Sequence, residues 1–365
     1  MKPLFHPALI NDPFGDPGLY VDCLFEKRAL LFDLGDLRAL APRKIQRVSD
    51  VFVSHAHMDH FFGFDWLFRI CLGRERRMRI YGPPGFLAQL EGKLAAYTWN
   101  LVARYDTDFT LEATEIHRDD RARCACFRCH NAFRRENEHE LAIDDGILLD
   151  EPAFRVRCRL LDHGTPCLGF ALEEKQHVNV WKDRLDALGF PTGAWLRELK
   201  QAVLAGQPDS TPFRVWWKAQ GVLHEKWLPL GELRQRILEI VPGQKIAYIT
   251  DVAYHADNVA HIGALAARVD LLFIEAPFLA ADAERAAETY HLTARQAGTL
   301  AHAAGAKTVI PFHFSPRYND RERELRGEIA AAFSGNAAPA ILCRRELTTI
   351  AACSPVARDH TDSTT

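Results

Sequence analysis

The chain of 365 residues lacks the features that mark membrane, secreted or disordered proteins. No stretch reaches about 18 uninterrupted apolar residues, so no membrane-spanning helix is predicted. The first residues, MKPLFHPALINDPFGDPG, contain no apolar segment typical of a signal peptide. Hydrophobic residues make up 48% of the chain and charged residues 25%, which supplies a sizeable core and excludes a disordered or fibrous protein.

Lysine is scarce, and the cysteines do not form a disulfide pattern. Only 11 of the 45 basic residues are Lys, which leaves 34 Arg. This bias fits either phosphate binding or genome composition. The net charge of −3 gives no global sign of a nucleic-acid binder. The nine Cys are odd in number and scattered, and a chain of this length needs no disulfides. We therefore expect a cytoplasmic protein with reduced thiols.

Short apolar runs alternate with helical patterns along most of the chain, which indicates an α/β architecture. Strands are predicted at residues 19–25, 29–33, 48–54, 79–81, 153–161, 168–174, 245–250, 269–275 and 308–312, and helices at 61–72, 86–97, 259–267 and 293–304. Two irregular stretches, about 114–146 and 176–232, are predicted to be insertions. The first would lie on the surface, and the second would pack partly on the body. We expect one domain over residues 1–345 and a disordered tail over 346–365.

Candidate metal ligands follow four of these strands directly. They are imidazoles and carboxylates, namely His55, His57, Asp59 and His60 after one strand, and His163, Asp251 and His313 after three others. Sites in sheet proteins gather at strand ends, so we expect these side chains to meet. Seven such groups exceed the needs of one tetrahedral ion and suit a pair of borderline metals such as Zn²⁺.

The spacing of the first four ligands has a physical basis. His55 and His57 are two residues apart, so both rings point to the same side of an extended segment. Asp59 and His60 come after a turn and can face a second ion. A lone histidine is more often an ordinary core or surface residue, but four ligand-type residues within six positions indicate a metal site.

This His-x-His-x-Asp-His motif resembles the signature of the metallo-β-lactamase superfamily. Further motifs resemble its ribonuclease Z branch, the tRNA 3′-processing endonucleases. They are YGPPG at 81–85, Asp162-His163 with PCLGF at 166–170, Asp251 after KIAYIT, IEAPF, HLTA at 291–294 and HFSPRY at 313–318. The resemblance covers roughly residues 20–335. It implies an αββα sandwich, with residues 1–345 as the catalytic domain and the two irregular stretches as insertions.

The resemblance also implies a di-metal site for phosphodiester hydrolysis. Two Zn²⁺ are expected, with Mn²⁺ or Fe as alternatives. One ion would be held by His55, His57 and His163, the other by Asp59, His60 and His313, and Asp251 would bridge them. A hydroxide activated by both ions would attack phosphorus. The implied reaction is removal of the 3′ trailer of precursor tRNA.

The same resemblance implies roles for four residues. His291 would bind the scissile phosphate and help to protonate the leaving oxygen. Glu275 would orient His291, Asp59 would steer the proton of the nucleophile, and Arg317 would clamp a phosphate oxygen. For Glu275 and Arg317, an ordinary surface or core ion pair stays an alternative.

Some features depart from the family pattern and leave the substrate open. NDPFGDPGL replaces an amino-terminal Leu-Gly-Thr stretch, HLTA replaces His-Ser-Thr, and Gly193-Ala194 stands where the tRNA-binding arm of the family carries Gly-Pro. Hydrolysis of a small phosphodiester or another ester therefore stays an alternative, as does a metal-binding regulatory module without turnover. A homodimer is compatible with the resemblance.

Two surface motifs are ambiguous. Cys124, Cys126 and Cys129 with His130 fit either a structural zinc site or a loop with free thiols. The Arg-rich segments 69–79 and 118–135 fit either contacts with a phosphate backbone or solvated faces.

Overall fold

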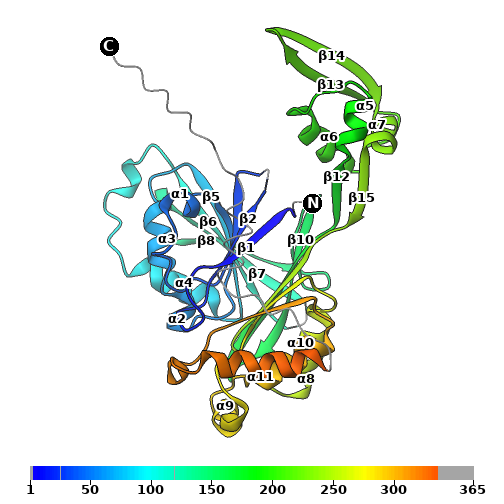
Figure 1. Cartoon of the computed structure of the whole chain (residues 1–365). Coiled ribbons are helices and arrows are strands. Elements are labelled where there is room, and N and C mark those ends of the chain that lie inside the picture. The colour runs from blue at the N-terminus through cyan, green and yellow to red at the C-terminus, as the bar shows by residue number, and fades with distance from the viewer. Residues whose placement is uncertain (1–2, 25, 119, 336–365) are drawn as a thin grey trace, which may run out of the picture.

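The computed structural model describes residues 3–24, 26–118 and 120–335 (Figure 1). Within these residues, two large sheets pack face to face, and helices cover the outer face of each. The first sheet has the strand order β1-β2-β3-β4-β5-β6-β7-β8, and the second has the order β18-β17-β16-β11-β10-β9. The predicted αββα sandwich is therefore confirmed.

The first sheet has a parallel centre, β3 to β6, with antiparallel strands on both sides. Its strands are β1 (Phe5–Leu9), β2 (Leu19–Cys23), β3 (Arg28–Phe32), β4 (Val48–Phe52), β5 (Arg76–Gly82), β6 (Phe109–Ile116), β7 (Arg121–Arg128) and β8 (Arg135–Ala142). The helical segments that follow its strands are α1 (Pro42–Ile45), α2 (Met58–Phe61), α3 (Phe64–Cys71), α4 (Phe86–Ala95), η1 (Val102–Arg104) and η2 (Cys129–Asn131).

The second sheet combines antiparallel β9, β10, β11 and β16 with parallel β16, β17 and β18. Its strands are β9 (Ile147–Asp150), β10 (Phe154–Asp162), β11 (Pro166–Glu174), β16 (Lys245–Ile249), β17 (Leu271–Glu275) and β18 (Thr308–Phe312). Its helical segments are α8 (Ala256–Leu265), η3 (Ala280–Asp282), α9 (Ala283–Glu288), α10 (Ala294–Ala303), η4 (Pro316–Tyr318) and α11 (Glu322–Ser334). Thr293 caps α10, in a capping box with Gln296.

Aromatic side chains fill the space between the two sheets. The ring of Phe170 on β11 lies 5.7 Å from those of Phe32 and Phe52 on β3 and β4. Tyr248 on β16 lies 5.9 Å from Phe32. Burial of each such ring contributes roughly 1.5–3 kcal/mol, so this layer holds the strand ends of both sheets in fixed positions.

The stretch 114–146 differs from its predicted role as a surface insertion. It forms the end of β6 and the whole of β7 and β8, which extend the first sheet. Ala122, Ala125 and Phe127 of β7 are buried, whereas the Arg residues between them face outward. The polarity that suggested a loop belongs to one solvated face and to the exposed edge strand β8.

The second insertion forms an arm that spans residues 176–242, ten residues longer than predicted. Antiparallel β12 (Gln176–Val180) and β15 (Leu238–Pro242) make its stalk, which explains the later end. The rest comprises α5 (Lys182–Ala187), α6 (Trp195–Leu204), β13 (Pro212–Ala219), β14 (Val222–Pro229) and α7 (Leu230–Ile237). The arm has its own core around Trp195 and projects away from the sandwich (Figure 1), while Leu196 and Leu204 of α6 line a cavity together with Leu4, Leu24 and Ala153 of the sandwich.

Several elements escaped sequence prediction, among them β1, β6, β9, α9 and α11. No helix in the described residues is long and apolar enough to cross a membrane. The tail predicted for residues 346–365 lies outside the described residues.

Candidate metal centre

The seven predicted ligands converge at one edge of the sandwich, where strands of both sheets end. His55 and His57 follow β4, Asp59 and His60 lie in α2, and His163, Asp251 and His313 follow β10, β16 and β18. The extended segment after β4 ends with His57 as the N-cap of α2, and the ring of His60 in this helix lies 4.2 Å from that of His55. Two sheets thus bring together residues that are up to 258 positions apart (55 to 313).

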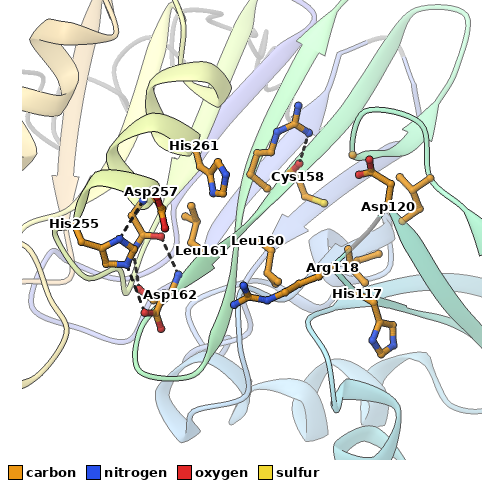
Figure 2. Close-up of a pocket in the computed structure, with 15 residues that line it drawn as sticks. His117, Arg118, Asp120, Cys158, Leu160, Leu161, Asp162, His255, Asp257 and His261 are labelled. Atoms are coloured by element: carbon orange, nitrogen blue, oxygen red, sulfur yellow. Dashed lines mark hydrogen bonds and ion pairs between the residues drawn. The ribbon is translucent and has the colours of Figure 1, made fainter.

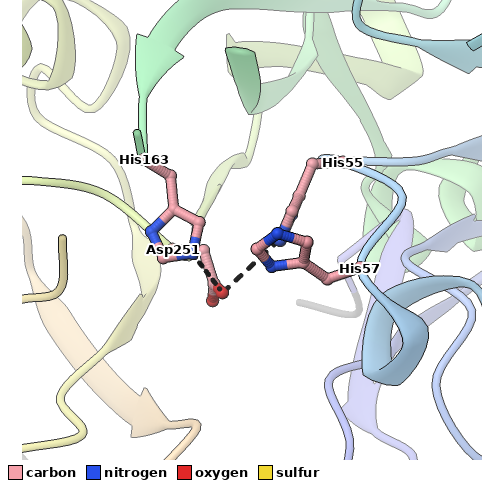
Figure 3. A group of neighbouring side chains, drawn as sticks. All are labelled: His55, His57, His163 and Asp251. Atoms are coloured by element: carbon pink, nitrogen blue, oxygen red, sulfur yellow. Dashed lines mark ion pairs between the residues drawn. The ribbon is translucent and has the colours of Figure 1, made fainter. Parts of the chain in front are cut away.

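One group of ligands comprises His55, His57, His163 and Asp251, whose potential ligand atoms all lie within 4.8 Å of one another (Figure 3). Oδ2 of Asp251 lies 3.5 Å from Nε2 of His55 and 3.3 Å from Nε2 of His163. His55, His163 and Asp251 are buried, whereas His57 is exposed. The opening of this group to solvent therefore lies on the side of His57.

The second group comprises Asp59, His60 and His313. The other carboxylate oxygen of Asp251, Oδ1, lies 3.4 Å from Nε2 of His60 and 3.0 Å from Nδ1 of His313. Asp59 Oδ2 lies 3.2 Å from Nε2 of His313. The two oxygens of Asp251 therefore face the two groups separately, which is the arrangement that a bridging carboxylate requires.

Unpaired nitrogens show that the residues fit a pair of cations. His55 Nε2, His60 Nε2 and His313 Nδ1 are buried without a hydrogen-bond partner among the described residues. Each such atom costs about 1–3 kcal/mol, a cost that coordination removes. Imidazole nitrogens with two carboxylates form a ligand set that suits Zn²⁺, and also Mn²⁺ or Fe.

The two groups differ in electrostatics. Burial lowers the pKa of His55 to about 2, so this imidazole is neutral, the form that binds a metal. Burial also acts to lower the pKa of His60, but the Asp251 and Asp33 carboxylates outweigh it and raise this pKa to about 10. The pKa of His313 is raised in the same way. Burial acts to lower it, but the nearby Asp251 carboxylate outweighs this effect. A bound cation would replace the protons of His60 and His313.

Asp33 supports this second group, and sequence reasoning missed its role. It is fully buried after β3, and its Oδ2 lies 2.9 Å from Nδ1 of His60. The same oxygen accepts hydrogen bonds from Ser54 Oγ at 2.8 Å and from Tyr248 OH at 2.9 Å. Such contacts fix the orientation of a ligating imidazole. The sequence pattern could have marked Asp33 as a candidate, because it follows a strand as the candidate ligands do.

Glu275 and His291 form a hydrogen-bonded pair beside the cluster. Nδ1 of His291 lies 2.8 Å from Oε2 of the buried Glu275. The backbone N–H groups of Val252 and Leu292 donate to Oε1 of Glu275 at 3.1 and 3.0 Å. Burial acts to raise the pKa of Glu275, but His291 outweighs it and lowers this pKa to about 2. The carboxylate is thus held charged and in one position.

The structure leaves the role of His291 as a prediction. Its ring lies 4.7 Å from that of His163, so it reaches the cluster as expected. However, its ligand atoms also group with those of Asp251, Glu275 and His313, so proximity alone does not separate it from the ligands. Arg317 is more remote, because its half-exposed guanidinium lies 3.9 Å from Asp282. Its role also stays a prediction.

The cysteine motif does not form a metal cluster in the described residues. Cys129 is buried in the core under the first sheet, and Sγ of Cys124 lies 3.6 Å from Oγ1 of Thr114. Nε2 of His130 lies 2.8 Å from the carbonyl oxygen of Tyr105. This placement favours free thiols over a zinc site.

A cavity of about 540 Å³ lies between the β6–β7 turn and the start of α8 (Figure 2). His117 and Arg118 of the β6–β7 turn line one side, and Asp162 and His255 line the other (Figure 2). None of the seven candidate ligands lines this cavity, although Asp162 directly precedes His163 in the sequence.

Five of the eleven arginines in segments 69–79 and 118–135 form ion pairs within the protein. Arg77, Arg79, Arg123, Arg128 and Arg135 each pair with a carboxylate. The charge available for phosphate contacts is therefore smaller than the sequence suggests.

Comparison with known proteins gives a consistent family. A model described as a beta-lactamase superfamily domain matches residues 19–181 and 236–314, so it omits only residues 182–235 of the arm between its two segments. A ribonuclease Z of Deinococcus radiodurans is 33% identical over 337 residues, which cover 89% of this chain and 94% of the relative. A ribonuclease Z of Microcystis aeruginosa is 29% identical over 278 residues, which cover 75% of this chain and 70% of the relative.

Solved structures support the fold. The metallo-beta-lactamase fold protein YhfI from Bacillus subtilis aligns with a TM-score of 0.52 at 16% identity, covering 92% of this chain and 95% of that one. The family model spans all seven candidate ligands. The chain therefore belongs to the ribonuclease Z family of the metallo-β-lactamase superfamily.

Proposed function

We propose that this chain is a metal-dependent endoribonuclease that removes the 3′ trailer of precursor tRNA. The observation that carries the proposal is the position of Asp251, whose two oxygens face two separate groups of imidazoles. The similarity to a ribonuclease Z along 89% of the chain supports RNA as the substrate class.

The proposed cofactor is a pair of Zn²⁺ ions, with Mn²⁺ or Fe compatible with the same ligands. His55, His57 and His163 would hold one ion, Asp59, His60 and His313 the other, and Asp251 both. Bound at this position, such ions supply Lewis acidity toward phosphoryl oxygens and lower the pKa of water.

His291 is the proposed acid for the leaving group. Its Nδ1 is engaged by Glu275, so Nε2 is the ring atom left to donate a proton. Attack of a water oxygen on phosphorus breaks the bond to the 3′-oxygen, and this oxygen takes the proton from His291. The two backbone N–H groups that hold Glu275 keep the imidazole in place during this step.

Asp59 is the proposed acceptor for the proton of the attacking water. Its side chain is 43% exposed, in contrast to the 3% exposure of Asp251, so it lies on the solvent side of the cluster. Arg317 is the proposed clamp for a phosphate oxygen, because its weak contact to Asp282 leaves most of its donors available.

A second candidate function is hydrolysis of a small phosphodiester. The observation that favours it is the ion pairing of five arginines of the β5–β8 region, which reduces the positive charge available for a polyanion. The complete ligand cluster argues against a regulatory module without turnover.

The test is incubation of metal-replete protein with trailer-bearing precursor tRNA and with a panel of small phosphodiesters. Cleavage next to the discriminator base supports the proposed function. Hydrolysis of the small esters without RNA cleavage contradicts it and supports the second candidate. Light scattering on the same preparation measures whether the chain is the homodimer that the resemblance allows.

A further inference from the structure

Tyr290 has an unusual backbone conformation beside the metal centre. Its φ is 60°, in the left-handed region that bulky residues rarely adopt. Two hydrogen bonds hold this turn, because the N–H groups of Tyr290 and His291 donate to the carbonyl oxygens of Ala287 and Ala286 at 3.2 and 2.8 Å. A strained residue next to a functional site indicates that its side chain has a use.

The backbone contact to the metal centre does not explain the side chain. The carbonyl oxygen of Tyr290 lies 2.9 Å from Nδ1 of His163, which orients this ligand. Glycine would supply the same carbonyl without the conformational cost. The aromatic ring must therefore be explained by something other than the orientation of His163.

Burial does not explain the ring either. The side chain of Tyr290 is 48% exposed, so it adds little to the core. It lies directly over Gly164, where an added Cβ would come within 2.7 Å of the ring. The ring centroid lies 6.5 Å from that of His163. Gly164 thus makes room for an aromatic surface that is open to solvent beside a candidate metal ligand.

We propose that the ring of Tyr290 stacks on an unpaired nucleobase next to the scissile phosphate. This inference rests on the proposed function, because it requires a single-stranded RNA segment at the metal centre. Exposed aromatic rings are the usual platforms for such bases, since every base has a π face. The ring would hold the strand by its base, while the strand-end residues act on its phosphate.

The experiment combines variants with a substrate that lacks the base. Tyr290→Gly removes the ring and keeps the carbonyl oxygen. Trailer-bearing RNA is compared with the same RNA made abasic at either nucleotide that flanks the scissile phosphate. Tyr290→Gly is expected to lower kcat/KM on the natural RNA by about tenfold, typical of one lost base–aromatic stack. On RNA that is abasic at the stacked position, the variant and the unchanged protein are expected to react at equal rates.

Controls separate stacking from a structural role. Tyr290→Phe keeps the ring and is expected to restore the rate lost in Tyr290→Gly. Tyr97→Ala removes a ring of similar exposure, 45%, that packs on Trp99 after α4, and is expected to have no effect. Metal content and the thermal midpoint of Tyr290→Gly are measured to verify that the site stays intact.

Three results would overturn the inference. An unchanged rate of Tyr290→Gly on natural RNA would do so, as would an equal loss on natural and abasic RNA, because the ring would then act only through His163. RNA cleavage by the unchanged protein that does not depend on the flanking bases would also contradict it. If the unchanged protein cleaves no RNA at all, the proposed function fails first, and the stacking inference fails with it.

Discussion

The edge of the sandwich that carries the ligand cluster and the arm of residues 176–242 use buried positions in opposite ways. At the edge, Asp33, His60 and Asp251 are buried together with their charges or unpaired nitrogens. In the arm, the buried side chains are apolar, with Trp195 fully covered, whereas Trp227 on β14 is 58% exposed. Burial of polar groups costs stability, which indicates that the buried polar residues of the edge serve the reaction. The apolar core of the arm serves only to stabilise the arm.

The connection between the two regions is narrow. The stalk strands β12 and β15 pair only with each other in the described residues. At the base, the buried Glu174 accepts a hydrogen bond from the backbone N–H of Gln244 at 2.9 Å and lies 2.7 Å from Nδ1 of His177. A change in the arm should therefore alter RNA binding but not the rate of phosphodiester hydrolysis at the edge. A change at the edge should alter the rate of hydrolysis but not RNA binding.

The largest effect is expected from Asp251→Asn. The neutral amide has one oxygen and cannot face both ligand groups with a charged atom. Hydrolysis of bis(p-nitrophenyl) phosphate should fall at least about 10⁴-fold, because metal ions contribute several kcal/mol of transition-state stabilisation. Elemental analysis should show less metal than the pair expected in the unchanged protein. Asp257→Asn, an exposed carboxylate in the first turn of α8, is the control. A cluster that keeps two ions and full activity without Asp251 would refute the bridging role.

The next largest effect is expected from His291→Ala. The variant should retain both ions, because six imidazole and carboxylate ligands besides Asp251 remain. Its rate should fall roughly 10²–10³-fold, the usual contribution of a positioned acid. Steady-state rates and elemental analysis are measured on the same sample. A full rate would exclude the acid role, and loss of one ion would place His291 among the ligands.

The edge was largely predictable from sequence, whereas the arm was not. Apolar strands followed at once by His or Asp indicated all seven candidate ligands, because strand ends of packed sheets meet. Asp33 also follows a strand, but its role in holding His60, 27 positions away, is visible only in the tertiary fold. In the arm and in β7–β8, exposed charged faces masked the alternation of the strands, so the local pattern indicated loops.

Asp33→Asn tests whether the edge depends on support behind the ligands. The variant loses the charge that fixes Nδ1 of His60. Metal affinity should fall about 10–100-fold, as is typical for such supporting groups. Competition with a chelator measures this affinity. Asp36→Asn, which removes a carboxylate paired with Arg38 at the surface, should leave it unchanged. Equal affinities in all three proteins would show that the imidazoles alone position the ions.

The smallest effect on small-ester hydrolysis is expected from removal of the arm. Val180 and Leu238 are paired at the end of the stalk, so residues 181–237 can be replaced by an Asn-Gly turn that closes a hairpin. Metal content and the rate on bis(p-nitrophenyl) phosphate should not change, since the arm core contains only arm residues. Cleavage of trailer-bearing RNA should fall at least about tenfold, which corresponds to about 1.4 kcal/mol of lost binding free energy. Trp227→Ala should reproduce part of this loss if the exposed side chains of β14 contact RNA. An equal loss on both substrates would show that the arm supports the edge itself, and the two regions would then be one functional unit.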